Sequence, residues 1–401
     1  MQGRDWTAFL AAACICCGPT LWPCATYAKD ASAPLTVPMQ LELDRPYIDV
    51  MLTGPNGHQV KAHAYVDTGG GALIFSAGLA KSLGLKANGK SLHEEGQTLI
   101  PTATPALDIG GRQIELVDAH ALIDASEPRT LGRTDAEMML PGRFLLRYVV
   151  TFDYPARAFT LADPGALKPD GTPVKAAISG GMPVVWASVA GKPYGFLLDT
   201  GGQYCMISSA NLGAWRKQHP AWPQVERAYG AANMQMGPSE TKLHMLRIAA
   251  LQWGPFRIED VGAVSRGAGN YEHGMSGIVG TPVIGSIGGN VLHHFKVTVD
   301  YPAHAIYLDG PAVVHDSPLD MVGIMLEPAV HGGYEIASVA HGAKDIQIGD
   351  ELLEVDGRDI SQAPFSTVVK LLSGSPGTSR TLLLQRGHTR LTVHAMVQPV
   401  F

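Results

Sequence analysis

An internal repeat is the feature of this sequence that most constrains its fold. Residues 150–161 align without gaps on residues 297–308, and eight of the twelve positions are identical. A repeat of this kind indicates two copies of one structural unit in the chain. Short runs with a β-strand pattern, such as residues 106–109 and 256–259, lie between the repeated segments. The sequence therefore predicts two equivalent lobes that are mainly β.

The same tetrapeptide, Asp-Thr-Gly-Gly, follows an apolar run in each copy, at residues 67–70 and 199–202. Nine residues after each aspartate comes a serine, Ser76 or Ser208. Serine is a favoured N-cap, so Ser76 is predicted to cap a helix over residues 77–83, and Ser208 opens a similar stretch. The two copies thus share a strand, a glycine turn and a helix start in the same order.

Two aspartates on such turns have a direct chemical interpretation. The glycines permit a tight turn that exposes Asp67 or Asp199, and each threonine hydroxyl can hydrogen-bond to the opposite loop. Two carboxyl groups brought close together cannot both ionise readily, so the pair shares one proton. One carboxyl then acts as a base toward a bound water, while the protonated one polarises a peptide carbonyl. The alternative is a pair of structural turns in inactive lobes.

These motifs, with an Asp-Tyr-Pro strand in each copy, resemble the retropepsin-like aspartic proteases, in particular the bacterial members, over residues 38–310. The resemblance implies a bilobal pepsin/retropepsin-like fold that cuts peptide bonds with no metal or organic cofactor. It also implies that Asp67 and Asp199 are the catalytic residues. The loop residues that would support them are Thr68, Gly69, Thr200 and Gly201.

The sequence departs from the family pattern around both loops. Gly70 and Gly202 stand where alanine or serine is more usual, so a serine hydroxyl bonded to the aspartate is absent or comes from elsewhere. The glycine segment that braces the loop reads as residues 277–280 (Gly-Ile-Val-Gly) in the second copy, with residues 287–288 (Ile-Gly) as a competing register. In the first copy it is degraded to residues 139–142 (Met-Leu-Pro-Gly). The candidates for the flap over the substrate are residues 91–104 and residues 229–241, and the alternative for either segment is a surface loop.

The residues after the second copy follow a different pattern. Residues 342–357 predict a turn, a strand and an Asp-Gly hairpin turn, and residues 364–372 predict a helix. This order resembles a PDZ domain of bacterial proteases, a fold that binds an extended peptide as an added strand. The predicted binding edge contains Gly323, Ile324 and Met325. The alternative is a PDZ-shaped tail that only packs against the lobes.

The composition is that of a folded chain with several domains. Hydrophobic residues make up 46% and charged residues 16% of the sequence, and 401 residues exceed one core of ordinary size. A formal charge of −6 gives no case for nucleic-acid binding, which needs a clustered positive surface. The predicted domains are a signal peptide at 1–28, lobes at 35–165 and 172–311, and a PDZ-like domain at 318–401.

The N-terminal residues have the pattern of a secretory signal peptide. The apolar stretch over residues 6–17 is too short to span a bilayer, and cleavage is predicted after Ala28, with residues 31–33 as a second site. The alternative is a buried N-terminal helix. A lipoprotein anchored through Cys24 would require small residues where this chain has bulky ones. Export would place the protein in the periplasm of a Gram-negative bacterium or outside the cell.

The cysteines and histidines form no catalytic or metal-binding pattern. Four of the five cysteines lie in the leader, so the exported chain would keep Cys205 alone and have no internal disulfide. Cys205 is predicted to be a buried structural thiol. The 15 histidines lack the convergent spacing of metal ligands, and the adjacent His293 and His294 would point to opposite faces of a strand. No metal site is predicted.

Two hypotheses from different functional classes follow. The first is an aspartic-type endopeptidase, a hydrolase acting as a monomer on a peptide or protein substrate. The second is a non-catalytic module in which decayed lobes and the PDZ-like domain capture extended peptides. Retention of both aspartates and both threonines favours the first, because a decayed enzyme would have little reason to keep all four.

Overall fold

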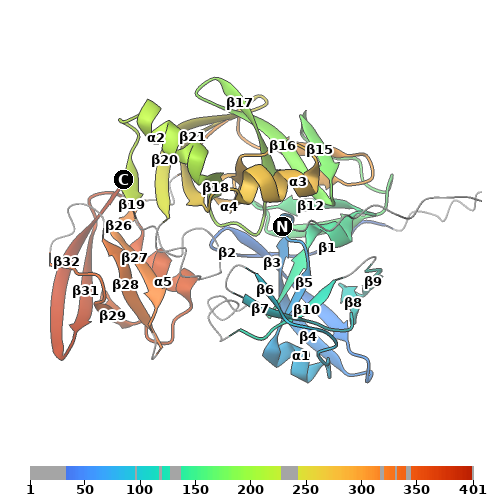
Figure 1. Cartoon of the computed structure of the whole chain (residues 1–401), viewed down its shortest axis with the longest axis horizontal. Helices are drawn as coiled ribbons and strands as arrows, with labels where there is room; N and C mark the ends of the chain where they lie inside the picture. The colour runs from blue at the N-terminus through green and yellow to red at the C-terminus, as the bar shows by residue number, and fades with distance from the viewer. Residues whose placement is uncertain are drawn as a thin grey trace, which may run out of the picture. The chain divides into compact units, whose positions relative to one another are not determined.

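A computed structural model of the chain describes residues 33–94, 97–116, 120–126, 137–226, 243–316, 320–329, 332–339 and 345–399. Strands dominate these residues and form four sheets (Figure 1), so the prediction of a mainly β chain is confirmed. In this part of the chain, no helix has the length and apolar character needed to cross a bilayer. The predicted signal peptide and Cys24 lie outside the described residues.

The sequence repeat lies at the centre of a six-stranded sheet. Its strands, in spatial order, are β1 (Leu35–Pro38), β13 (Ala158–Ala162), β12 (Val149–Asp153), β23 (Lys296–Asp300), β24 (Ala305–Asp309) and β14 (Thr172–Val174). The antiparallel pair β12 and β23 places Thr151 opposite Thr298, with their hydroxyl oxygens 2.9 Å apart. These threonines occupy the same position in the two copies, so a local twofold axis passes between them.

Each copy of the repeat also builds the same turn after its central strand. The carboxylate of Asp153 accepts a hydrogen bond from the backbone N–H of Ala156 at 2.9 Å. Asp300 accepts the equivalent bond from Ala303 at 3.0 Å. Aspartate side chains commonly close turns in this way, which accounts for the shared Asp-Tyr-Pro-Ala sequence.

Two larger sheets contain the aspartates. One has the order β6 (Leu92–Glu94), β7 (Gln97–Pro101), β10 (Ala121–Asp124), β5 (Leu73–Ser76), β11 (Met138–Pro141), β4 (Gln59–Asp67), β3 (Arg45–Thr53), β8 (Ala106–Ile109) and β9 (Arg112–Ile114), with β2 (Gln40–Glu42) beside β3. The other has the order β15 (Ala176–Ser179), β16 (Met182–Val189), β17 (Lys192–Leu198), β22 (Gly285–Ile287), β18 (Cys205–Ser208), β21 (Phe256–Arg266), β20 (His244–Trp253) and β19 (Gln224–Glu226), with β25 (Val313–His315) beside β21.

The two larger sheets repeat one pattern of strand pairing. Strand β4 pairs in parallel with β11, as β17 does with β22. Strand β5 runs antiparallel to β11 and parallel to β10, and β18 has the same relations to β22 and β21. Asp67 ends β4, and Asp199 directly follows β17. The duplication therefore puts the two aspartates at equivalent strand ends.

Both predicted helix starts are present. Helix α1 (Ala77–Ser82) begins after Ser76, whose hydroxyl accepts a hydrogen bond from Leu79 N at 3.2 Å. Helix α2 (Ser209–Gln218) begins after Ser208, which accepts the same bond from Asn211 N at 3.2 Å. Each serine satisfies a backbone N–H that the first helical turn leaves unpaired. The cap predicted at Ser76 is confirmed.

The C-terminal residues form the fourth sheet. Its members are β26 (Asp320–Val322), β32 (Thr389–Pro399), β31 (Ser379–Arg386), β29 (Glu351–Val355), β28 (Tyr334–Val339) and β27 (Ile324–Pro328), with β30 (Arg358–Asp359) beside β29. Helix α5 (Phe365–Leu372) lies between β30 and β31 in the sequence. Asp356 and Gly357 have φ angles of 51° and 76°, as the predicted Asp-Gly hairpin between β29 and β30 requires. The predicted helix over residues 364–372 is confirmed within one residue.

A large hydrophobic cluster draws residues from all of the first three sheets. The rings of Phe152 and Phe159 are fully buried in it and meet edge to face, with centroids 5.4 Å apart. Burying each of these rings contributes about 1.5–3 kcal/mol to folding. Cys205 is also buried here, as predicted for a structural thiol.

The adjacent histidines do not lie on a strand, so the opposite-face arrangement expected on a strand does not apply to them. His293 and His294 follow the short helix α4 (Gly289–Leu292) rather than lying on a strand, and their ring centroids are 4.0 Å apart. Neighbouring residues on a helical turn are about 100° apart, whereas on a strand they point to opposite faces. Among the described residues, no three His, Cys, Asp or Glu side chains converge as a metal site would require.

Candidate active site

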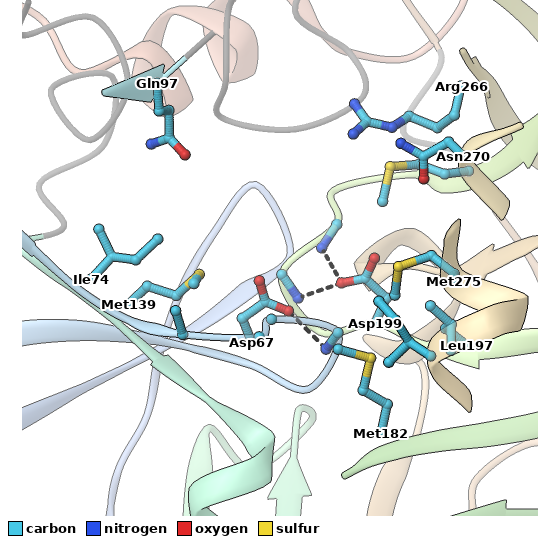
Figure 2. Close-up of a pocket in the computed structure, with 18 of the residues that line it drawn as sticks. Asp67, Ile74, Gln97, Met139, Met182, Leu197, Asp199, Arg266, Asn270 and Met275 are labelled. Atoms are coloured by element: carbon cyan, nitrogen blue, oxygen red, sulfur yellow. Dashed lines mark hydrogen bonds between the residues drawn. The ribbon is translucent and has the colours of Figure 1, made fainter. Parts of the chain in front are cut away.

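The two Asp-Thr-Gly-Gly loops lie face to face. Figure 2 shows the carboxyl groups of Asp67 and Asp199 side by side, one from each loop. The carboxyl groups are in hydrogen-bond contact with each other. Asp199 is buried, and Asp67 is partly exposed. The structure therefore brings together the two aspartates that the sequence placed 132 residues apart.

The two threonines lock the loops together. Each backbone N–H, of Thr68 and of Thr200, donates to the hydroxyl of the other threonine at 3.0 Å. The Thr68 hydroxyl donates across to the Leu198 carbonyl at 2.5 Å, and the Thr200 hydroxyl donates to the Val66 carbonyl at 2.6 Å. Both side chains are fully buried. The four bonds fix each loop on the strand that leads into the other aspartate.

Replacing Thr200 by valine is expected to destabilise the chain by about 2–4 kcal/mol, because two buried hydrogen bonds are lost and the Thr68 N–H is left unpaired. Valine keeps the shape of threonine, so the loss reports hydrogen bonding. Urea unfolding measures it. The matched control is Thr36→Val, which removes an exposed hydroxyl pair with Thr160 and is expected to change stability by less than about 0.5 kcal/mol. Equal effects of the two substitutions would contradict the role of the lock.

The backbone of each loop donates to its own aspartate. Asp67 Oδ1 accepts a hydrogen bond from Gly69 N at 2.8 Å. Asp199 Oδ1 accepts from Gly201 N at 3.1 Å and from Gly202 N at 3.0 Å. These N–H groups hold the carboxyl groups at the mouth of the turn and stabilise negative charge on them.

Burial raises the pKa of both aspartates, and the charge of Asp199 raises that of Asp67 further. For Asp67 the largest cause is burial, followed by the negative charge of Asp199. For Asp199 burial also raises the pKa, while hydrogen bonds from Ser286 and Gly202 act in the opposite direction. A close buried pair of this kind retains one proton between them over a range of pH in which isolated carboxyls are ionised.

Glycine at the third position of each loop is required by the approach of the opposite carboxyl. A Cβ at Gly69 would lie 3.0 Å from Asp199 Cγ. A Cβ at Gly201 would lie 2.6 Å from Asp67 Oδ1 and closer still to its Cγ. Any side chain at Gly201 would therefore separate the two aspartates or displace the loop.

The structure decides between the two candidate bracing segments. Ile287 pairs with Leu198, and its carbonyl accepts the Asp199 N–H at 3.0 Å. Residues 277–280, the first choice from sequence, instead form helix α3 (Ser276–Val279) and its left-handed end. The Gly-Ile-Val-Gly reading is therefore wrong, because strand register and not the local motif determines which glycine lies under the loop.

The degraded segment of the first copy still braces its loop. Strand β11 pairs in parallel with β4, with Pro141 opposite Asp67. Gly142 then begins the short helix η2 (Gly142–Leu145), and a Cβ there would lie 2.8 Å from Thr68 Cα. The glycine is therefore retained where the chain packs against the Asp67 loop, although the residues before it differ from the pattern of the proteases that the sequence resembles.

Two residues at the site were missed from sequence. Arg45 is 1% exposed, and its Nε donates to the Gly201 carbonyl at 2.7 Å. Ser286, on β22, provides the serine hydroxyl that Gly70 and Gly202 cannot supply, and it hydrogen-bonds Asp199. Neither residue belongs to a local motif. The competing Ile-Gly register was the one signal that pointed toward Ser286, since it directly precedes Ile287.

A pocket of about 430 Å³ opens on the aspartates. Figure 2 shows apolar side chains on both sides of the pair. They are Ile74 and Met139 near Asp67, and Met182, Leu197 and Met275 near Asp199. Gln97, Arg266 and Asn270 add polar groups to the wall. The pocket therefore presents apolar surface on either side of a pair of carboxyl groups.

One flap candidate reaches this pocket. Strands β6 and β7 form an antiparallel hairpin within residues 91–104, and Gln97 and Leu99 of β7 line the pocket. The second candidate, residues 229–241, lies outside the described residues. The hairpin therefore fits the position that a flap would require.

The remaining candidates lie away from this pocket. Burial raises the pKa of the Cys205 thiol to about 12, so it is not an activated nucleophile. Ile324 and Met325, with Gly323 before them, lie at the start of β27, and both side chains are buried in a second hydrophobic cluster. Strand β27 pairs with β28 and ends the order of its sheet as far as the chain is described.

Comparisons with known proteins give a distant structural likeness. No family model and no curated protein matches the sequence. A crystal structure of aspartic proteinase from Irpex lacteus matches with 11% sequence identity and a TM-score of 0.38. The match covers 70% of this chain and 98% of that chain.

Proposed function

We propose that this chain is an aspartic-type endopeptidase with two pepsin/retropepsin-like lobes. The observation that supports the proposal most strongly is the pair of Asp-Thr-Gly-Gly loops. Four hydrogen bonds through Thr68 and Thr200 hold Asp67 and Asp199 in contact at the base of a pocket. A purely structural pair of turns would have no need to bury two carboxyl groups against each other, since their repulsion is unfavourable.

In the proposed reaction the dyad supplies both proton transfers. The ionised aspartate takes a proton from a water as the water oxygen attacks the scissile carbonyl carbon. The protonated aspartate gives its proton to the carbonyl oxygen, which forms a neutral tetrahedral diol. The carbon–nitrogen bond then breaks as the aspartate that took the proton from water gives it to the amine nitrogen, and a diol hydroxyl returns a proton to the other aspartate. The two carboxyl groups serve as acid and base, so no cofactor takes part.

Cleavage of an unstructured protein such as casein, measured between about pH 3 and pH 8, tests the proposal. Fragments should appear with the native chain and not with Asp199→Asn. A statine-type inhibitor such as pepstatin should bind the native chain tightly, because it mimics the tetrahedral diol. Absence of cleavage and of inhibitor binding across this range would favour the non-catalytic peptide-binding module instead.

We further propose that the C-terminal sheet is a PDZ-like module that binds peptides at β27. Support comes from the position of this strand: it pairs with β28 and is last in its sheet among the described residues. An exposed strand edge can accept an extended peptide through backbone hydrogen bonds. Gly323, Ile324 and Met325 begin this edge.

Peptide binding is expected to require a free C-terminal carboxylate. The measurement is fluorescence anisotropy of labelled peptides on the full chain carrying Asp199→Asn, which prevents cleavage during titration. Amidation of the peptide C-terminus should weaken binding by about tenfold or more, because charge-assisted hydrogen bonds are lost. Equal affinity for both peptide forms would contradict this mode of binding, and no binding would favour a tail that only packs against the lobes.

The proposed location is outside the cytoplasm. The N-terminal pattern supports export with cleavage after Ala28. Mass spectrometry of the chain purified from its host would identify the mature N-terminus. A chain that retains residues 1–28 would argue against a cleaved signal peptide, and a lipid on Cys24 would identify a lipoprotein.

A further inference from the structure

The two halves of the candidate site differ at one equivalent position. On β11, Met139 pairs with Tyr65, two residues before Asp67. On β22, Ser286 pairs with Leu197, two residues before Asp199. The duplicated strand pairing therefore gives one aspartate a methionine beside it and the other a serine. A thioether has no proton to donate, whereas a hydroxyl can donate one.

The serine hydroxyl is held in a buried chain of hydrogen bonds. Tyr271, on the helical turn η4 (Asn270–Met275), donates its hydroxyl proton to Ser286 Oγ at 3.1 Å. Ser286 in turn hydrogen-bonds the carboxyl group of Asp199. Ser286 is fully buried, and Tyr271 is 3% exposed. Because Tyr271 donates to the serine oxygen, the serine proton is left to donate to the carboxyl group of Asp199.

The carboxyl groups consequently differ in the donors that stabilise their negative charge. Asp199 receives two backbone N–H groups and the Ser286 hydroxyl. The Asp67 carboxyl receives the backbone N–H of Gly69, whereas the Gly70 N–H donates to the main-chain carbonyl of Asp67. The neighbour of Asp67 at the equivalent strand position is Met139. A hydrogen bond to the charged form favours ionisation of the group that accepts it.

We propose that Ser286, oriented by Tyr271, is a positioning residue that keeps Asp199 as the ionised member of the dyad and places the shared proton on Asp67. The inference rests on the proposed endopeptidase function and deepens it by assigning the two roles. Asp199 is then the base toward water, and Asp67 the acid toward the carbonyl oxygen. The pKa directions agree with this assignment of roles. The hydrogen bond from Ser286 lowers the pKa of Asp199, and the charge of Asp199 raises the pKa of Asp67.

Other titratable groups surround the dyad and remain unchanged in the test. They are Tyr65, Tyr154, Cys205, Tyr271, Tyr301 and Arg45, with His120 and Arg266 on the pocket wall. Burial raises the pKa of Tyr65, Tyr154, Tyr301 and Cys205, so these groups stay neutral through the acidic range. His120 and Arg266 are present in every variant compared, so any effect that they have on the pH profile is the same in each and drops out of the difference.

The test is the pH profile of kcat/KM for Ser286→Ala beside the native chain. The acidic limb reports ionisation of the base. It is expected to move up by about one pH unit, because a hydrogen bond to a charged carboxylate lowers its pKa by about that amount and the variant lacks this bond. Tyr271→Phe should move the limb in the same direction by a smaller amount. Ser265→Ala is the matched control: Ser265 is a buried serine of the same sheet that accepts from His244 N, and its loss should leave the limb in place. A lower kcat in Ser286→Ala with an unmoved limb would overturn the proposal.

A second measurement does not depend on catalysis. Carboxyl ¹³C NMR titration, with the dyad signals assigned through Asp67→Asn and Asp199→Asn, follows each ionisation directly. In the native chain, Asp199 should be the group that ionises at the lower pH. Ser286→Ala should reduce the difference between the pH values at which Asp199 and Asp67 ionise. If Asp67 ionises first, the assignment is wrong even when the chain cleaves peptides. If the chain cleaves nothing, the proposed function fails while this titration still decides the role of Ser286.

Discussion

Asparagine in place of Asp67 or of Asp199 is expected to lower kcat/KM for peptide cleavage by about 10⁴-fold or more, as removal of an acid–base group from an interdependent catalytic set does. An amide cannot take a proton from water and cannot hold the shared proton. Its shape matches that of the carboxyl group, so the loops and their threonine lock should persist. The measurement is steady-state cleavage of one peptide identified from the casein digest.

The control for charge alone is Asp49→Asn. Asp49 is 45% exposed and pairs with Lys61 on the surface, so its loss should leave kcat/KM unchanged. Activity near that of the native chain in either Asp67→Asn or Asp199→Asn would exclude the dyad as the catalytic group. If Asp49→Asn also lost activity, the loss in the dyad variants would reflect the removal of any one negative charge and not the removal of a catalytic group.

The same substitutions have an expected effect on stability with a definite sign. Folding raises the pKa of both carboxyls above the ordinary value of 3.8, so the folded chain binds protons more tightly than the unfolded chain. The contribution of the dyad to stability is therefore greatest in acid and falls as the pH rises from the ordinary carboxyl pKa through the raised ones. Asp67→Asn removes one of the two carboxyl groups whose ionisation lowers stability. Urea unfolding at pH 7 should therefore find this variant more stable than the native chain. A variant less stable at pH 7 would contradict the burial of charge at the dyad.

The sequence was most informative where one short segment determines its own conformation. Aspartate followed by Thr-Gly-Gly forms a turn at the end of an apolar strand, and Ser76 caps the helix that it precedes. The repeat around Thr151 and Thr298 added the one long-range relation, because two copies of a unit are expected to pair about a twofold axis. Local chemistry and symmetry together were therefore enough to bring Asp67 and Asp199 to one place.

The sequence was uninformative where a contact depends on strand register or on distant segments. Arg45 meets the carbonyl of Gly201 from 156 residues away, and nothing near Arg45 in the sequence marks it as part of this site. Ser286 reaches Asp199 only because Ile287 pairs with Leu198. A Gly-Ile-Val-Gly motif matches the family pattern better than the segment that lies under the loop, so the motif pointed to residues 277–280 instead.

The glycines of the two loops show how closely the halves of the site depend on each other. Gly201 belongs to the loop of Asp199, yet the atoms that a Cβ there would meet are those of Asp67. Gly69 has the reciprocal relation to Asp199. Arg45 also holds the carbonyl of Gly201 at 2.7 Å, so this loop cannot shift outward without breaking a buried charge-assisted hydrogen bond. Strain introduced on one side is therefore transmitted to the aspartate of the other.

Gly201→Ala is accordingly expected to destabilise the chain by about 1–3 kcal/mol, the usual cost of forcing an atom into a packed site. It should also lower kcat/KM by about 100-fold or more, because a displacement on the order of 1 Å between reacting groups has that effect. Gly69→Ala, whose Cβ would lie 3.0 Å from Asp199 Cγ, should show the same losses to a smaller extent. Urea unfolding and steady-state cleavage measure the two quantities on the same preparations.

The matched control is Gly71→Ala, two residues further along the first loop, where an added Cβ would meet no atom within 4 Å. Its stability should stay within about 0.5 kcal/mol of the native value, as for most surface substitutions. The order of effects should therefore be Gly201 first, Gly69 second and Gly71 last. If Gly201→Ala were as stable and as active as Gly71→Ala, the carboxyl of Asp67 could not lie against the opposite loop, and the two loops would not form one catalytic site.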